Sequence, residues 1–110
     1  MRLSDEKALI EQFAPLLNLH NFKITISKGE LQDEICRANC DFIHQTIHII
    51  KGSEYYKMTP EQQRNTIIHE LVESRILWME QKIQDKTHSI IYQEREDLVN
   101  EITKVFERIK

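Results

Sequence analysis

Residues 59–80 read TPEQQRNTIIHELVESRILWME and carry the strongest helix signal in the chain. Thr59 precedes Pro60, and Gln62 follows three residues after the threonine. In such a helix start the threonine hydroxyl accepts a backbone N–H, proline fits the first helical position, and the glutamine side chain reaches back. Apolar residues then recur at near-helical spacing without an intervening Gly or Pro: Ile67, Ile68, Leu71, Val72, Ile76, Leu77 and Met79. The segment predicts a long, well-buried helix around which a small domain is organised.

The middle of this helix holds the pentad His69-Glu70-Leu71-Val72-Glu73. His69 and Glu73 are four residues apart, so their side chains leave the same face of a helix, and Glu70 lies about 100° round. The zinc-protease motif H-E-x-x-H uses this geometry, with two histidines on the metal and the glutamate activating water. Glu73 stands where the second histidine of that motif would be. The pentad therefore predicts a site with one imidazole ligand and one carboxylate ligand.

The pentad can also be explained without a metal, as an ion pair on a helix. A His and a Glu at this spacing form an ordinary helix pair worth about 0.2–0.5 kcal/mol. The apolar neighbours of the pentad predict that its charges are partly buried, and buried charge needs a partner or an ion. The pattern thus predicts either a metal site or a charged cluster packed between helices.

Length and charge restrict the class of protein. The chain has 110 residues, which predicts a single domain spanning 1–110. It has 15 Lys and Arg against 18 Asp and Glu, a formal net charge of −3, so no basic surface for nucleic acid is expected. There is no long apolar run and no signal-peptide pattern, which predicts a cytoplasmic protein without a membrane segment. In that compartment Cys36 and Cys40 are expected to be free thiols. The sequence does not determine the oligomeric state.

The rest of the chain predicts an α+β domain. Residues 4–17 have helical periodicity, and Pro15 would end or kink that helix. Alternating apolar and polar residues predict strands at 22–27, 34–39 and 45–51. The connections are too short for parallel crossovers, so a three-stranded antiparallel sheet is expected. A last helix, capped by Thr87 or Ser89, would extend to Ile109. The predicted order is an N-terminal helix, the sheet, the long helix with the pentad, and a C-terminal helix.

Two further patterns bear on metal binding. Cys36, Cys40, His44 and His48 recur every four residues and would form a zinc site on a helix, but the alternation predicts strands here, where only a sharp bend could gather them. Arg95, near the apolar stripe of the last helix, could pair with Glu70 or Glu73. Such a pair would close the site and disfavour a metal.

The two C-terminal helical segments resemble those of the compact zincin-like metallopeptidases of the minigluzincin type, small proteins often found in phages and bacteria. The run TIIHELVESRILWME is similar to the family's T-x-x-H-E-L-x-H helix, and YQEREDLVNEITKVF is similar to its Glu-bearing final helix. The resemblance implies a zinc ion and a substrate peptide lying extended against the edge strand of the sheet. It also implies His69 as the first metal ligand and Glu70 as the catalytic general base.

The resemblance also implies the remaining ligands, at positions where this chain departs from the family pattern or offers alternatives. Glu73 replaces the family's second histidine, which gives H-E-x-x-E. Glu96 fits best as the third ligand, because it precedes an apolar pair as the family's glutamate does. His88 and Glu94 are alternatives, and His88 shares a helix face with Glu96.

The change to Glu73 predicts altered chemistry. One nitrogen and two carboxylates form a harder, more negative ligand set than two histidines and a glutamate, which weakens the cation as a Lewis acid and favours Mn²⁺ or Mg²⁺ relative to Zn²⁺. The expected function is a metal-dependent peptidase of reduced activity, with a divalent metal, zinc first, as cofactor. The alternative is a degenerate, non-catalytic protein of zincin fold that binds a partner protein. A peptide or protein is the expected substrate or partner in either case.

Overall fold

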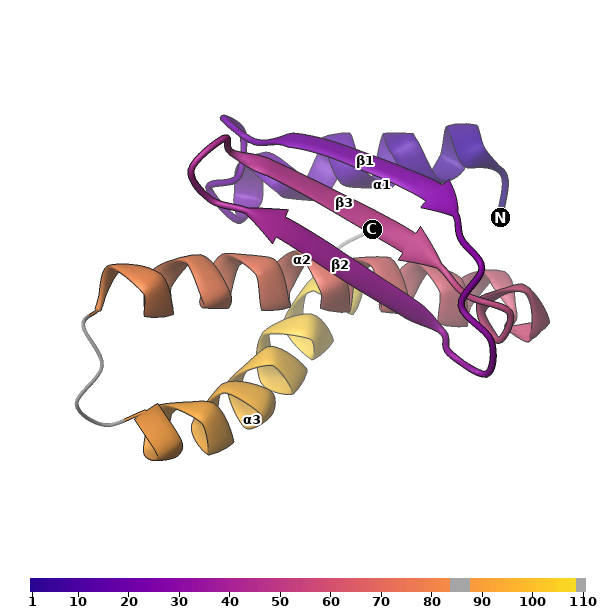
Figure 1. Cartoon of the computed structure of the whole chain (residues 1–110). Helices are drawn as coiled ribbons and strands as arrows, with labels where there is room; N and C mark the ends of the chain where they lie inside the picture. Colours follow the sequence, from indigo (N-terminus) through magenta and orange to yellow (C-terminus); the bar gives the residue numbers. More distant parts are fainter. Residues whose placement is uncertain (84–87, 109–110) are drawn as a thin grey trace.

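The computed structural model describes residues 1–83 and 88–108, and the side chains of 88–94 are outside the description. Three helices and three strands make up the described fold, so the predicted α+β class and the order of elements are confirmed (Figure 1). The elements are α1 (Leu3–Leu16), β1 (Lys23–Lys28), β2 (Cys36–Asp41), β3 (Thr46–Lys51), the 3-10 turn η1 (Tyr55–Lys57), α2 (Pro60–Lys82) and α3 (His88–Glu107). The caps expected at Thr87 or Ser89 lie outside the described residues or side chains.

The sheet is mixed, so the prediction of an antiparallel sheet is wrong. Its strand order is β1-β3-β2, with β3 in the centre. β2 and β3 form an antiparallel hairpin, whereas β1 pairs parallel with β3, for example Ile26 opposite Ile49. The connections between consecutive strands are short, but the parallel partners β1 and β3 are not consecutive. The segment 29–45, which includes β2, is long enough for the crossover that a parallel pair requires.

The second strand is displaced two residues along the chain from the predicted 34–39. The carbonyl oxygens of Glu34 and Ile35 accept hydrogen bonds from the N–H groups of Glu54 and Gly52, so this part of the chain holds the start of the loop after β3. At the C-terminal end of β2, one Asp41 carboxylate oxygen accepts hydrogen bonds from the N–H groups of residues 43 and 44, both at 3.1 Å. Asp41 thereby organises the tight connection to β3, as aspartate commonly does in turns.

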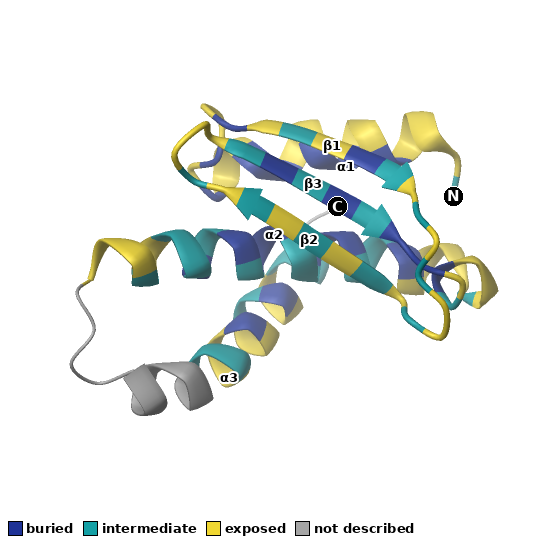
Figure 2. Ribbon diagram, in the orientation of Figure 1, coloured by how far each residue is buried: buried dark blue, intermediate teal, exposed yellow. Residues whose placement is uncertain are grey.

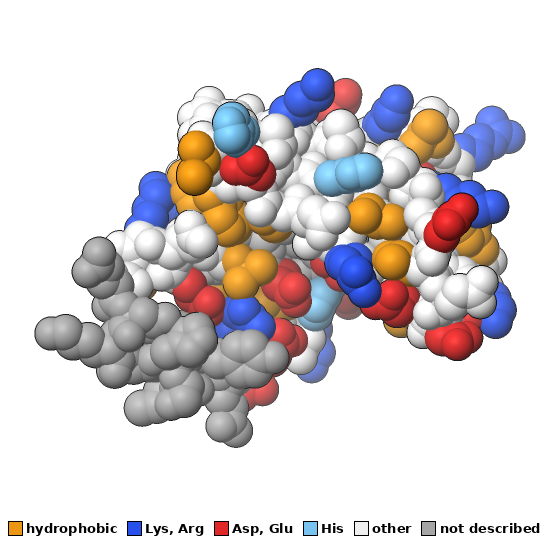
Figure 3. Space-filling model, viewed as in Figure 1, with side chains coloured by type: hydrophobic (Ala, Val, Ile, Leu, Met, Phe, Trp, Pro, Cys, Tyr) orange, Lys and Arg blue, Asp and Glu red, His pale blue; other side chains and the backbone are white. Residues whose placement is uncertain are grey.

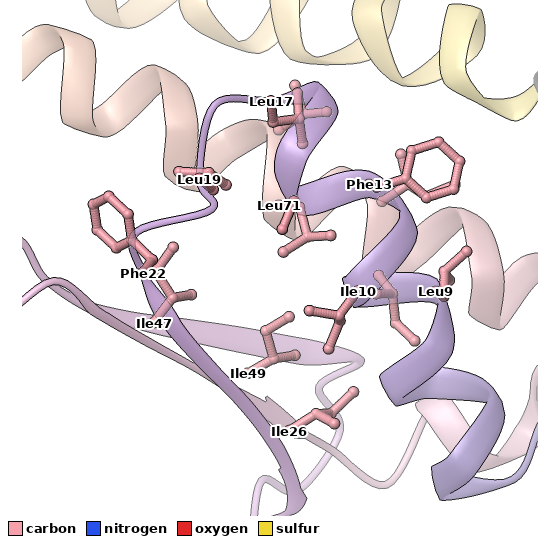
Figure 4. Packing of buried hydrophobic residues seen from close by; sticks show 14 of the residues in the cluster. Leu9, Ile10, Phe13, Leu17, Leu19, Phe22, Ile26, Ile47, Ile49 and Leu71 are labelled. Carbon is pink, nitrogen blue, oxygen red and sulfur yellow. The ribbon is translucent and has the colours of Figure 1, made fainter.

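One face of the sheet is covered by α1 and α2, and the opposite face is open (Figure 1 and Figure 2). Ile47 and Ile49 of the central strand point into the core and have no exposed surface. Figure 4 shows side chains of α1 and of the sheet converging on this core, with Leu71 of α2 beside them. The period-2 alternation of β3 therefore sorts its residues between the core and the open face.

α2 begins as its sequence predicts. The Thr59 hydroxyl accepts the Gln62 N–H at 3.2 Å, and the Thr59 N–H donates to the Gln62 side-chain oxygen at 3.0 Å. This reciprocal capping box fixes where the long helix starts. α3 then returns against α2, where Val99 is fully buried and Phe106 meets Phe13 of α1 edge to face, with ring centroids 5.5 Å apart.

A buried polar cluster, not anticipated from the sequence, ties α1 to the end of the sheet. The Glu6 side chain has no exposed surface, and one of its oxygens lies 2.8 Å from the Lys51 ammonium. The Tyr55 hydroxyl donates to the other oxygen, and burial raises the pKa of Tyr55 well above its usual range. Because removing one member would leave an uncompensated buried charge, this cluster fixes the packing of α1 on β3.

Candidate functional site

The pentad residues lie on the part of α2 that packs between β2 and α3. Ile67, Ile68, Leu71 and Val72 are buried, as expected from the apolar flanks. The side chains of His69 and Glu73 retain only 30% and 28% of their exposed surface. Figure 3 shows acidic side chains, Lys or Arg side chains and a histidine gathered on the surface below the sheet. The prediction of a partly buried charged cluster is confirmed.

α3 adds a third potential ligand to this cluster. His69, Glu73 and Glu96 each offer one ligand atom, and these three atoms all lie within 4.8 Å of one another. In the described part of the chain, no other group of His, Cys, Asp or Glu side chains meets this condition. The alternatives His88 and Glu94 lie outside the described side chains. The fold thus brings together the three residues that the sequence favoured, although they come from two helices.

The geometry of the three side chains is compatible with a divalent cation. In a tetrahedral site with bonds of about 2.1 Å, neighbouring ligand atoms lie about 3.4 Å apart. The distance from His69 Nε2 to Glu73 Oε2 is 3.5 Å, which matches that spacing. The Glu96 side chain keeps 46% of its exposed surface, so it has room to adjust. One imidazole and two carboxylates are a donor set that suits zinc and, with its oxygen ligands, also manganese or magnesium.

The charges of His69 and Glu73 stabilise each other. The hydrogen bond to Glu73 raises the pKa of His69, with burial opposing and the charge of Glu70 adding to the rise. The same hydrogen bond lowers the pKa of Glu73. The two shifts agree in direction with a charged pair, which is the metal-free arrangement that the sequence also allowed.

Glu70 occupies a different environment beside the edge strand β2. Burial, with the negative charge of Glu73 as the next cause, raises the pKa of Glu70 to about 7. Burial also raises the pKa of the Cys36 thiol on β2 to about 12, and the charge of Glu70 is the next contribution. Glu70 is therefore a carboxyl group that can exchange a proton near neutral pH, placed between the ligand cluster and the sheet edge.

Ser74 joins α2 to β2 one turn beyond Glu70. Its hydroxyl is fully buried, donates to the Glu70 carbonyl oxygen at 2.8 Å, and lies 3.4 Å from the Cys40 sulfur, which can donate to it. The sequence analysis did not single out this residue. The available signal in the sequence was a small polar residue within the apolar stripe of the helix.

The alternative zinc pattern at residues 36–48 is not assembled. Cys36 and Cys40 lie on the face of β2 toward α2 and are both free thiols. His48 is on the opposite face, where its Nε2 atom lies 2.7 Å from the Ser27 hydroxyl. His44 pairs with Asp41 in the hairpin loop at 2.7 Å. A strand places the four side chains on different faces and too far apart for one ion.

Arg95, which the sequence placed near the site, reaches it at Glu96, one of the three candidate ligands. Among the described residues, its guanidinium makes ion pairs with Glu80 at 3.7 Å and with Glu96 at 3.4 Å. Its charge contributes only a minor lowering of the Glu73 pKa. Arg95 is therefore a cation beside one of the three candidate ligand carboxylates, Glu96.

Comparisons with known proteins leave the family open, because no protein-family model, curated protein or solved structure matches this chain. The resemblance to the zincin-like metallopeptidases therefore stays a prediction from the two sequence segments. No helix in residues 1–83 or 88–108 has the length and apolar character needed to cross a bilayer.

Proposed function

We propose that this protein is a small metal-dependent peptidase of reduced activity, with His69, Glu73 and Glu96 as the metal ligands and Glu70 as the general base. The observation that carries the proposal is the convergence of three ligand atoms from α2 and α3 within 4.8 Å, next to the partly buried carboxyl group of Glu70. The resemblance to compact zincin-like metallopeptidases supports the same assignment. Zinc is the first candidate for the cation, with manganese and magnesium as alternatives.

A cation held by these three residues would supply a Lewis acid that polarises the carbonyl group under attack. Glu70 would take a proton from the attacking water while the water oxygen bonds to the carbonyl carbon. It would then deliver that proton to the leaving nitrogen as the C–N bond breaks. A carboxylate at this position can accept the proton of the water and return it, as a general base that then acts as a general acid.

The edge strand β2 supports a peptide as the substrate. β2 pairs with β3 along one side only, so its other side offers unpaired backbone groups. The hydrogen bond between Cys40 and Ser74 places this strand directly beside the helix that carries Glu70. An extended peptide can add to such an edge through main-chain hydrogen bonds, which would position its backbone near the site.

The test is hydrolysis of a mixture of unrelated peptides, followed by mass spectrometry, with protein dialysed against Zn²⁺, Mn²⁺ or Mg²⁺. We expect cleavage by the wild type and a loss of about 10²–10⁴-fold in Glu70→Gln, the range typical of a missing general base. Both proteins should contain the same amount of metal. Equal rates for the wild type and Glu70→Gln would contradict the proposed role of Glu70.

A non-catalytic binding protein is the second candidate function. The ion pair between His69 and Glu73 is a complete arrangement without a metal, and the open side of β2 would serve a protein partner equally well. This candidate predicts no hydrolysis with any of the three cations. It also predicts that Glu70→Gln leaves partner binding intact, whereas a proline at exposed Asn39 in β2 weakens it.

A further inference from the structure

A cleft of about 570 Å³ extends from His69 along the groove between α2 and α3. Its walls include Asn65, Thr66 and His69 of α2 and Asn100, Lys104 and Glu107 of α3. We propose that this cleft binds a carboxylate of the substrate, with Lys104 as the residue that recognises it. This inference rests on the proposed function, because it names the substrate class of the same site.

The two helices present matching rows of side chains to this groove. Asn65, His69 and Glu73 follow each other at four-residue intervals on α2, and Glu96, Asn100 and Lys104 do so on α3. Residues four apart share a helix face, so each row runs along one side of its helix. The ligand cluster lies at the Glu73 and Glu96 ends of the rows. The cleft occupies the Asn65 and Lys104 ends, next to it.

The available hydrogen-bond donors favour an acceptor ligand. The hydroxyl of Thr66 donates to the Gln62 carbonyl at 2.9 Å, and that of Thr103, also in the wall, donates to the Val99 carbonyl at 2.6 Å. Both hydroxyl protons are therefore used within their own helices. The donors left for a ligand are the Lys104 ammonium and the amide NH2 groups of Asn65 and Asn100, and a carboxylate accepts hydrogen bonds from all three. Among the described residues the buried Oδ1 atom of Asn65 has no hydrogen-bond partner, and it would accept one from a peptide N–H beside that carboxylate.

Charge balance points to the same ligand. Among the described residues Lys104 makes no ion pair, although Glu107 lies in the same wall. Lys104 is thus a cation in a cleft whose neighbouring site collects three carboxylates. It would attract a substrate carboxylate and orient it away from those negative groups.

Distance restricts where this carboxylate lies in the substrate. Glu96 and Lys104 are eight residues apart, or about 12 Å along the helix axis. A lysine side chain reaches back by about half of that distance, which leaves a span of about two extended residues. The carboxylate would therefore belong to the first or second residue beyond the bond that is cleaved. It would be either an acidic side chain or the free carboxyl end of the peptide.

The experiment uses short peptides that differ only in this group. One pair has a glutamate or a glutamine side chain at the same position, and a second pair has a free or an amidated carboxyl end. Binding to metal-loaded Glu70→Gln protein and to metal-free protein is measured by NMR titration, and cleavage is measured with the metal-loaded wild type. The protein variants are Lys104→Ala, Lys104→Arg and Lys104→Glu, with Lys23→Ala on the exposed surface of β1 as the matched control.

We expect the carboxylate form of at least one pair to bind about tenfold more tightly than its neutral counterpart. Lys104→Ala should abolish this preference, Lys104→Glu should reverse it, and Lys104→Arg and Lys23→Ala should keep it. The pair that shows the preference identifies the source of the carboxylate. Metal content should be the same in all of these variants.

A preference that survives in Lys104→Ala, or the absence of any preference in the wild type, would overturn the inference. Metal-dependent cleavage without a carboxylate preference would leave the proposed function standing and refute only the role of Lys104. A Lys104-dependent preference in a protein that neither holds metal nor cleaves peptides would support the role of Lys104 and refute the proposed function.

Discussion

The partly buried carboxyl group of Glu70 gives a direct prediction for the stability of the metal-free protein. Its pKa is raised from 4.5 to about 7, first by burial and then by the charge of Glu73. Between these values the folded protein binds more protons than the unfolded chain, so stability falls as pH rises from about 4.5 and through 7. Below pH 4.5 the group is protonated in both states and has no effect.

The size of this effect follows from the pKa change. A pKa rise from 4.5 to about 7 corresponds to about 3 kcal/mol in the free energy of unfolding if solvent does not screen the group. Glu70 has partial solvent access, which reduces this to about 2 kcal/mol. Glu70→Gln removes the titrating group while keeping its shape. The metal-free variant should therefore be more stable than the wild type by about 2 kcal/mol at pH 8 and equally stable near pH 4.

Urea denaturation followed by circular dichroism, with a chelator present, measures this difference across pH 4 to 8.5. Glu30→Gln, in an exposed loop, is the matched control and should follow the wild-type curve at every pH. If Glu70→Gln and the wild type give parallel curves, the carboxyl group is not desolvated in the folded protein. The placement of Glu70 between α2 and β2 would then be wrong.

Three further predictions concern other contacts. Lys51→Met should destabilise the fold by about 3–5 kcal/mol in urea denaturation, because it leaves Glu6 charged and buried without its cationic partner. The matched change Lys57→Met, at an exposed ion pair, should leave the urea midpoint unchanged. Equal effects of the two changes would contradict a buried Glu6. Thr59→Ala should cost about 1 kcal/mol through loss of the α2 cap, and an unchanged midpoint would argue against the capping box. Metal affinity, measured by calorimetry, should fall as the pH drops through the raised pKa of His69, because the protonated imidazole cannot bind a cation. A metal affinity that does not change between about pH 5 and 8 would exclude His69 as a ligand.

The helices could be predicted closely from sequence because their signals are local. The cap at Thr59 and Gln62 and the apolar stripe that follows depend only on residues within a few turns of one another. The pairing of β1 with β3 is not local, since it depends on a crossover that passes through β2. Alternation located the three strands, the second of them two residues too early, but alternation does not specify the neighbour of a strand.

The candidate site shows the same division between local and distant information. The four-residue spacing of His69 and Glu73 on one helix could be predicted from sequence alone. The position of Glu96 depends on how α3 packs against α2, which the sequence of either helix alone does not specify. The family resemblance had favoured Glu96 as the third ligand, and the structure has its side chain beside His69 and Glu73. The cleft with Lys104 was missed, because an exposed lysine on an amphipathic helix has no distinctive pattern until the facing helix is known.

Elemental metal analysis tests the central claim most directly. Untagged protein, purified without chelator and dialysed against micromolar Zn²⁺, would be compared with Glu73→Ala, Glu96→Ala and the control Glu30→Gln, with Mn²⁺ and Mg²⁺ in parallel. The account predicts about one divalent cation per wild-type or Glu30→Gln chain, and loss of that cation in both Ala variants, because each removes one of the three ligands. A wild type that stays empty with all three cations, or Ala variants that hold as much metal as the wild type, would contradict it.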